Sequence, residues 1–225
     1  PGEFLKLDDN KYKFQLTAEL WETIYADKIQ LIALDHPDSV DVFVDERFTP
    51  FSNYDYELFR VSNKRLPVSA TDADGNNQLP AISKDDDNYV SSLYFEEFQG
   101  VTDLSNLTLD LGNIDNSKNL KLFLNGWVFP TDASINYSIG QSGKITTIAP
   151  QIQAINKKGE WETIIENFSF PMGKDKTIVV DLTGKIPTSD ARIRIHTNMQ
   201  IYWDHIFFSN EEISTPVNSY KINPT

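Results

Sequence analysis

Short runs in which apolar and polar residues alternate make up most of the chain. Examples are "KYKFQLT", "LKLFLNGWVF", "ARIRIHT" and "IYWDHIFF", all rich in β-branched and aromatic residues. Alternation with a period of two is typical of a strand that buries one face. Turn sequences such as "DADGNN", "NKKG" and "TGKIPTSD" separate the runs. Because no alternation of strand and long helix is sustained, the pattern predicts an all-β protein, an antiparallel β-sandwich or jelly roll.

The same pattern leaves little room for helix. "LTAELWETIYADKI" supports at most a turn or two around Glu19–Tyr25, and "TDASINYSIGQS" fits either a short helix or a structured loop. The polar stretch 71–88 is the expected internal boundary. We therefore expect an additional N-terminal β segment over residues 1–88, which can pack on the rest, a jelly-roll-like sandwich over 89–210, and a surface tail over 211–225.

Composition indicates a packed core and an acidic surface. Of the 225 residues 40% are hydrophobic and 12% aromatic, which is ample for a core. Thirty-three acidic residues against 20 basic ones give a net charge of −13. Such a surface disfavours nucleic acid and anionic membranes as partners, because both need clustered Lys and Arg. It favours solubility or the binding of cations.

No apolar run approaches the roughly 18 residues of a membrane helix, and no signal peptide is visible at the start, "PGEFLKLDDN". We therefore expect no direct membrane insertion, and a fragment of a larger chain whose export signal lies upstream. The chain has no cysteine, which excludes disulfides, thiolate metal sites and cysteine nucleophiles together.

Five stretches resemble one kind of known protein. They are "LTAELWETIYADKIQLIALDHP", "VFVDERF", "LFLNGWVFPTDASIN", "GEWETIIENFSFPMGKDKTIVVDLTGK" and "RIRIHTNMQIYWDHI", in this order over roughly residues 12–208. Together they resemble a C-terminal module of secreted bacterial proteins that contain FG-GAP propeller repeats, often with an ASPIC/UnbV segment, or tetratricopeptide repeats instead. The strand pattern of residues 92–210 is also similar to galactose-binding-like jelly rolls.

The resemblance implies a non-catalytic extracytoplasmic module of the cell surface, the periplasm or the medium. It further implies a partner, either another protein or an upstream repeat domain of the same chain. Neither the propeller repeats nor the ASPIC/UnbV segment is visible in this sequence. The chemistry that those parts supply is therefore absent from these residues.

An aspartate beside a histidine, Asp204-His205, raises the question of a catalytic pair. Neighbouring side chains on a strand point to opposite faces, so the two residues cannot form a dyad on one face. A hydrolase triad also needs a nucleophile, and no GxSxG nucleophile elbow is present. The stretch "IGQSGK" around Ser142 is only loosely similar to that motif. A hydrolase that uses Asp or Glu with His36, His196 or His205 remains an alternative to a binding module.

Two other polar groups have structural interpretations. Asp35 and His36 precede Pro37, so "LDHP" indicates a strand that ends in a turn. Asp45, Glu46 and Arg47 in "VDERF" form a second polar cluster. Because the Arg47 guanidinium can clamp a carboxylate in bidentate fashion, we expect a structural ion pair and not an active site.

The best metal candidate is the loop "TDADGNN". Asp72, Asp74 and Asn76 offer oxygen ligands at alternate positions around a glycine, as calcium prefers. The distal Glu of an EF-hand is missing, since Ser83 stands at that position. Asp85–Asp87 can complete such a site from the same loop. The alternative is a solvated turn that binds no ion.

Aromatic residues indicate where a ligand would bind. The four tryptophans must mostly fill the core, but Trp127 and Trp161 lie beside loops and are expected to be partly exposed. Exposed Trp platforms hold sugar rings in many β-sandwich modules. The stretch "GWVFPTDASIN" adds the polar residues Asp132, Ser134 and Asn136. We therefore expect this loop to form the wall of any ligand groove.

These observations favour a non-catalytic module for binding or assembly, part of a larger bacterial surface or secreted protein. One alternative is a carbohydrate-binding module with an aromatic platform at Trp127 or Trp161. The other is the hydrolase described above. Calcium is the one cofactor for which the sequence offers a candidate site.

Overall fold

The computed structural model describes residues 7–9, 11–14, 25, 28–48, 57–115, 118–173, 175–211 and 216–223. The chain forms two compact units. One consists of residues 1–36 and 216–225, and the other of residues 37–215. Among the described residues, no helix combines the length and the apolar character that crossing a membrane requires.

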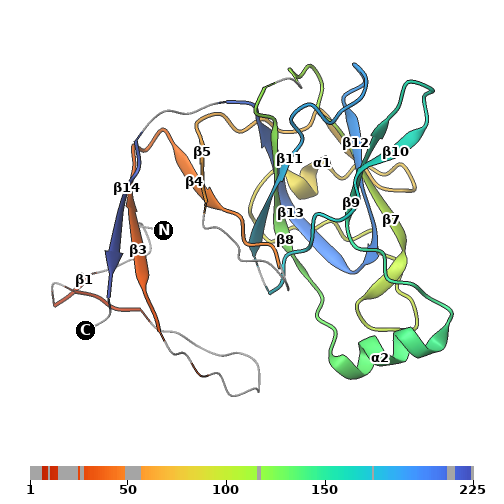
Figure 1. Cartoon of the computed structure of the whole chain (residues 1–225), viewed down its shortest axis with the longest axis horizontal. Helices are drawn as coiled ribbons and strands as arrows, with labels where there is room; N and C mark the ends of the chain where they lie inside the picture. The colour runs from red at the N-terminus through yellow and green to blue at the C-terminus, as the bar shows by residue number, and fades with distance from the viewer. Residues whose placement is uncertain are drawn as a thin grey trace. The chain divides into compact units, whose positions relative to one another are not determined.

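The larger unit contains a five-stranded and a three-stranded sheet, in both of which all paired strands are antiparallel (Figure 1). In spatial order, the first sheet consists of β10 (Trp161–Ile165), β9 (Gln151–Ile155), β12 (Arg192–Met199), β7 (Val101–Asp110) and β6 (Ser69–Thr71). The second consists of β11 (Lys176–Asp181), β8 (Lys121–Val128) and β13 (Ile201–Ser209). The expected all-β architecture with antiparallel sheets is thus confirmed.

The core lies between the inner faces of the two sheets. On β12, Ile193 and Ile195 are buried while Arg194 and His196 are half-buried, which is the period of two seen in the sequence. Leu122 and Leu124 of β8 and Trp203 of β13 belong to the same buried cluster, so both sheets contribute to it. Burial of these apolar side chains is the main stabilising force of the sandwich.

A hairpin covers part of the outer face of the three-stranded sheet. It consists of β4 (Asp41–Val44) and β5 (Leu58–Val61). Phe43 of β4 packs on Phe123 and Phe207, whose rings are stacked with centroids 4.7 Å apart. These aromatic contacts form a second, smaller core and explain why residues before the polar stretch 71–88 belong to the sandwich unit.

Two helices occur among the described residues, α1 (Leu79–Ile82) and α2 (Ala133–Ser142). The stretch "TDASINYSIGQS" therefore forms a helix and not an irregular loop. Asp132 caps its N-terminus by accepting a hydrogen bond from the Ile135 backbone N–H at 2.8 Å, and Gly143 ends it with a φ of 62°. In Figure 1, α2 lies at the lower end of the sandwich, in the connection from β8 to β9. Of the other expected helical stretch, Glu19–Tyr25, all residues except Tyr25 lie outside the described residues.

The smaller unit contains two short antiparallel pairs. One pair joins β3 (Leu31–Asp35) to β14 (Asn218–Ile222), and the other joins β1 (Leu7–Asp8) to β2 (Lys11–Tyr12). Part of the expected surface tail, residues 211–225, is therefore a strand with exposed side chains. Strand β6 belongs to the expected N-terminal segment 1–88, but it pairs with β7 and forms an edge strand of the five-stranded sheet of the larger unit.

Candidate binding site

Polar side chains gather on the outer face of the five-stranded sheet. Because β12 turns Ile193 and Ile195 inward, Arg194 and His196 point to the opposite side. Residues directly opposite each other in paired strands share one face, which extends this row across the sheet. We use the name polar face for these residues: Asn106, Thr108, Gln151, Gln153, Trp161, Thr163, Arg194 and His196.

A chain of hydrogen bonds crosses three strands of the polar face. Arg194 Nε donates to Gln153 Oε1 at 2.5 Å, and Gln153 Nε2 donates to Thr163 Oγ1 at 3.1 Å. The Thr163 hydroxyl in turn donates to Gln151 Oε1 at 3.4 Å. These bonds fix the orientation of side chains that would otherwise rotate freely, so the face is organised before any ligand arrives.

Trp161 lies at the edge of this network. The Arg194 guanidinium stands over its ring, 4.6 Å from the ring centre. Burial lowers the pKa of Arg194, although the group keeps its charge at any physiological pH. The cation is attracted to the electron-rich face of the indole, and this attraction holds the ring in place.

His196 lies two residues beyond Arg194 on β12. Its Nδ1 lies 2.8 Å from the Asn106 side-chain oxygen. Burial, with a smaller effect of the positive charge on Arg194, lowers the pKa of His196 below its usual value of 6.5. The imidazole is therefore neutral at neutral pH. Because the Asn106 carbonyl oxygen can only accept, Nδ1 carries the proton and Nε2 remains as an acceptor.

The polar face includes only one of the four residues expected to bind a ligand, Trp161. Trp127 lies on β8 of the other sheet, stacked on Tyr202 with ring centroids 4.7 Å apart, and the edge of Tyr89 contacts it. Trp127 is half-buried in this aromatic cluster. The two tryptophans expected to be partly exposed therefore belong to different sheets and cannot form one platform.

Asp132 and Asn136 lie at the first turns of α2. Besides capping the helix, Asp132 accepts a hydrogen bond from the Ser134 hydroxyl at 2.6 Å, which, with the bond from the Ile135 backbone, lowers the pKa of its carboxyl. Asn136 Oδ1 accepts a hydrogen bond from the Thr131 hydroxyl at 3.0 Å. The Asp132 carboxylate thus has a structural role in starting the helix.

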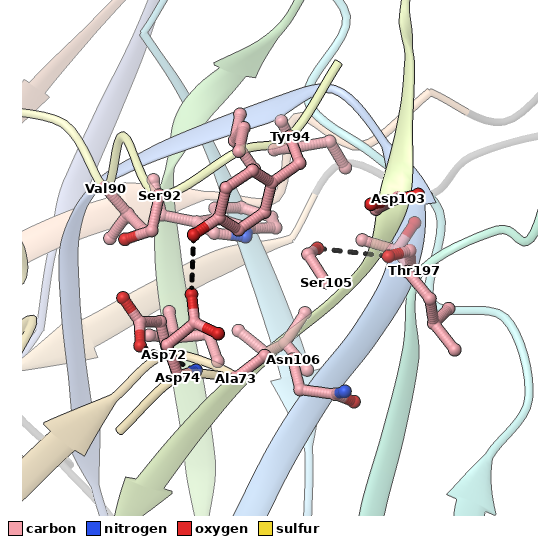
Figure 2. A pocket seen from close by; sticks show the side chains of 16 residues that line it. Asp72, Ala73, Asp74, Val90, Ser92, Tyr94, Asp103, Ser105, Asn106 and Thr197 are labelled. Atoms are coloured by element: carbon pink, nitrogen blue, oxygen red, sulfur yellow. Dashed lines mark hydrogen bonds between the residues drawn. The ribbon is translucent and has the colours of Figure 1, made fainter. Parts of the chain in front are cut away.

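The loop with the candidate calcium ligands borders a small cavity of about 40 Å³, enough for a single water molecule (Figure 2). Asp72 accepts hydrogen bonds from the backbone N–H groups of Asp74 and Asn76, at 3.0 and 2.8 Å, and from Gln78 Nε2 at 2.8 Å. Figure 2 shows the Tyr94 hydroxyl directed at Asp74, to which it donates at 2.8 Å. The carboxylate oxygens of Asp72 and Asp74 that were proposed as metal ligands thus already accept hydrogen bonds.

The pKa of Asp72 supports the interpretation of the loop as a turn held by its own hydrogen bonds. Burial alone would raise the pKa of Asp72, but hydrogen bonds from Ser92, Asn76 and Gln78 outweigh it and lower the pKa to about 2. Within the described residues, no group of three or more His, Asp or Glu side chains is placed to hold a metal ion. Calcium at Asp72, Asp74 and Asn76 stays a prediction.

Asp204 and His205 have separate roles. Asp204 is fully buried, and its carboxylate accepts hydrogen bonds from the backbone N–H groups of Asp86 and Asp87 at 3.2 and 3.3 Å. Burial raises its pKa, and the neighbouring Asp85 carboxyl raises it further. The His205 ring lies 5.0 Å from the Phe207 ring, and burial lowers its pKa. The Asp204 carboxylate thus anchors the acidic stretch Asp85–Asp87 through its backbone.

The ion pair expected in "VDERF" is confirmed. Arg47 Nε donates to the Asp45 carboxylate at 2.7 Å, and a second guanidinium nitrogen donates to the Val179 carbonyl oxygen. Asp45 is 6% exposed, so its charge needs this partner.

Sequence reasoning did not single out the glutamines of the polar face or the pairing of Arg194 with Trp161. The signal was present in "ARIRIHT" and "QIQAI", because alternation places Arg194 and His196 on one side of their strand and Gln151 and Gln153 on one side of theirs. What the sequence cannot show is that the two strands are neighbours.

No family model matches the chain, and no curated protein matches it. The resemblance to modules of FG-GAP proteins therefore stays a prediction, and the function is argued from the geometry of the described residues.

Proposed function

We propose that residues 37–215 form a non-catalytic carbohydrate-binding module whose binding surface is the polar face. One observation supports this most strongly. A chain of hydrogen-bonded polar side chains, in which Arg194 is the one charged member, runs across β9, β10 and β12 and adjoins a tryptophan that the same guanidinium holds in place.

The residue types suit sugar hydroxyls. A hydroxyl group donates one hydrogen bond and accepts others, so its partners must include both donors and acceptors. The side-chain amide of Gln151 offers both, and the neutral imidazole of His196 adds an acceptor nitrogen. Trp161 adds an amphipathic ring whose edge or free face can pack on the C–H groups of a sugar ring.

The geometry also limits the cost of binding. Arg194 and the two glutamines are already held by their neighbours, so little rotational freedom is lost when a ligand arrives. A sheet face is also a rigid support compared with a loop. A shallow, extended face of this kind fits an oligosaccharide chain better than a compact small molecule.

A location outside the cytoplasm belongs to this proposal, because polysaccharides are abundant on cell surfaces. The resemblance of "VFVDERF" and "LFLNGWVFPTDASIN" to modules of secreted bacterial proteins supports it. So does the expected partner, an upstream repeat domain of the same chain or another surface protein. Cell fractionation of the source organism tests the location, and recovery of the protein only in the cytoplasm would contradict it.

A glycan array tests the binding function. We expect the wild-type chain to bind a related subset of neutral or uronic-acid oligosaccharides, and Trp161→Ala to weaken binding about tenfold or more, the loss of about 1.4 kcal/mol of ring contact. Trp127→Ala is the matched control, since it removes a tryptophan from the other sheet. An array without wild-type signals, or full binding by Trp161→Ala, would overturn the proposal.

A further inference from the structure

A second cavity lies at the end of the sandwich where α2 is attached. Its volume is about 260 Å³, and it is bounded by the start of β7, the end of β8, α2 and the segments around Phe48 and Phe170. We call it the end cavity. The Phe48 and Phe170 rings are stacked with centroids 5.4 Å apart, and Phe129 contributes a third ring to the lining.

The chain has two methionines, and both line the end cavity. Met172 is 44% exposed and Met199 is half-buried. Unbranched, polarisable thioether side chains adapt to the shape of a ligand and make favourable contacts with aromatic rings. Both methionines line the same cavity beside three phenylalanines, which is the first indication that the cavity binds a ligand.

The end cavity also differs in charge from the rest of the molecule. The chain has a net charge of −13, and each of three other cavities is lined by carboxylates, two of them also by Lys or Arg. Among the residues that the structure describes, no charged side chain lines the end cavity. An ionised ligand would lose its hydration there without finding an opposite charge, so the cavity selects a neutral molecule.

The side chain of Asn136 provides a hydrogen-bond donor on one side of the cavity. Asn136 lines the cavity, and its Oδ1 is occupied by the hydrogen bond from the Thr131 hydroxyl at 3.0 Å. This bond assigns the carbonyl side of the amide to Thr131 and leaves the NH₂ side as a donor. A ligand that presents a hydrogen-bond acceptor at the α2 side would satisfy it.

We propose that the end cavity binds a small, neutral molecule that contains an aromatic ring and one hydrogen-bond acceptor. The volume fits: an engineered apolar cavity of about 150 Å³ is known to bind benzene, and the end cavity has room for a substituted ring. This site is separate from the polar face and shares no residue with it. The inference therefore does not depend on carbohydrate binding.

The test uses the two methionines as reporters. A sample labelled with ¹³C at the methionine methyl groups gives two NMR signals, from Met172 and Met199. We expect acetophenone, which is neutral and has a carbonyl acceptor, to shift both signals until they saturate. Benzoate has a similar shape but a negative charge, and we expect it to leave both signals in place.

Two variants separate the cavity from nonspecific contact. Asn136→Trp places a bulky side chain in the lining, while Tyr137→Trp places the same side chain at a neighbouring position that is 70% exposed and outside the lining. Saturable shifts that persist in Tyr137→Trp and vanish in Asn136→Trp support the proposal. Shifts that grow linearly without saturation, or that are equal for benzoate, overturn it. If Asn136→Trp does not fold, Thr147→Trp blocks the same cavity from an exposed position.

Discussion

The guanidinium of Arg194 lies 4.6 Å from the centre of the Trp161 ring, although the two residues belong to strands that are not neighbours. Strand β9 lies between β12 and β10, and its Gln153 accepts a hydrogen bond from Arg194. The long side chain thus reaches across one strand to the edge of the sheet. This contact joins the hydrogen-bonded row and the aromatic ring into one surface.

Replacing Arg194 measures the strength of this contact. We expect Arg194→Ala to lower the free energy of unfolding by about 1–2 kcal/mol, because it removes a half-buried cation–π contact and one hydrogen bond. Arg192→Ala is the control: its exposed pair with Asp190 should contribute about 0–1 kcal/mol. Urea unfolding measures the free energy of unfolding of both variants. Equal losses of this free energy would show that the stacking of Arg194 on Trp161 adds nothing to stability.

Stability should fall as the solution is acidified through the range where histidine titrates. Burial lowers the pKa of His196 and His205 in the folded chain below 6.5, so the unfolded chain binds protons first. The stabilising effect is fully present above pH 6.5 and is lost as the pH falls from there through the folded-state values. Urea unfolding between about pH 5 and about pH 8 measures this slope.

The double variant His196→Gln, His205→Gln is the control for that slope. Glutamine does not titrate, so the loss of stability below pH 6.5 should become smaller in this variant. The carboxyl of Asp204 acts in the opposite direction, because its raised pKa favours the folded state at acid pH. A slope that is unchanged in the double variant would rule out the histidines as its cause.

Asp204 should be needed as an acceptor and not as a charge. Asp204→Asn keeps an oxygen for the N–H groups of Asp86 and Asp87, and we expect it to be nearly neutral or slightly stabilising at neutral pH. Asp204→Ala leaves those donors without their acceptor, and we expect a cost of about 1–3 kcal/mol. A large loss in Asp204→Asn, equal to that of Asp204→Ala, would show that the negative charge itself is required.

The Asp72 loop should keep its shape without an ion. Asp72→Ala removes the acceptor for the N–H groups of Asp74 and Asn76, and we expect a loss of about 1 kcal/mol, reduced by exposure of the loop. The alternative of a turn that binds no ion requires the same wild-type melting temperature in EDTA and in calcium. A calcium-dependent rise that disappears in Asp74→Ala would instead establish this loop as a metal site.

The sequence predicts which residues share a face much better than which strands are neighbours. Alternation in "ARIRIHT" places Arg194 and His196 opposite the core, and the structure agrees. The prediction works because the period of two is a local property of the strand. The order β10-β9-β12-β7-β6 depends on pairings between distant segments, which no local pattern records.

The same limit explains the candidate residues around α2. "GWVFPTDASIN" was expected to form one groove wall. Residues 128–131 and Asn136 of this stretch line the end cavity, but Trp127 does not. Strand β8 ends at Val128, and the chain then changes direction into the helix. Trp127 therefore faces Tyr202 on its own sheet, and Asn136 lines the end cavity. Residues that are close in sequence lie far apart in the fold when a strand ends between them. In this stretch the sequence signal for the change from strand to helix was Asp132, which caps the helix.

The most direct test of carbohydrate binding is an NMR titration that observes the indole N–H groups. The four tryptophans give four signals, one of which belongs to Trp161. We predict that an oligosaccharide identified on the glycan array shifts the Trp161 signal until it saturates and leaves the signal of Trp127, on the opposite sheet, in place. A saturating shift at Trp127 with Trp161 unchanged would contradict the assignment of the polar face as the binding surface.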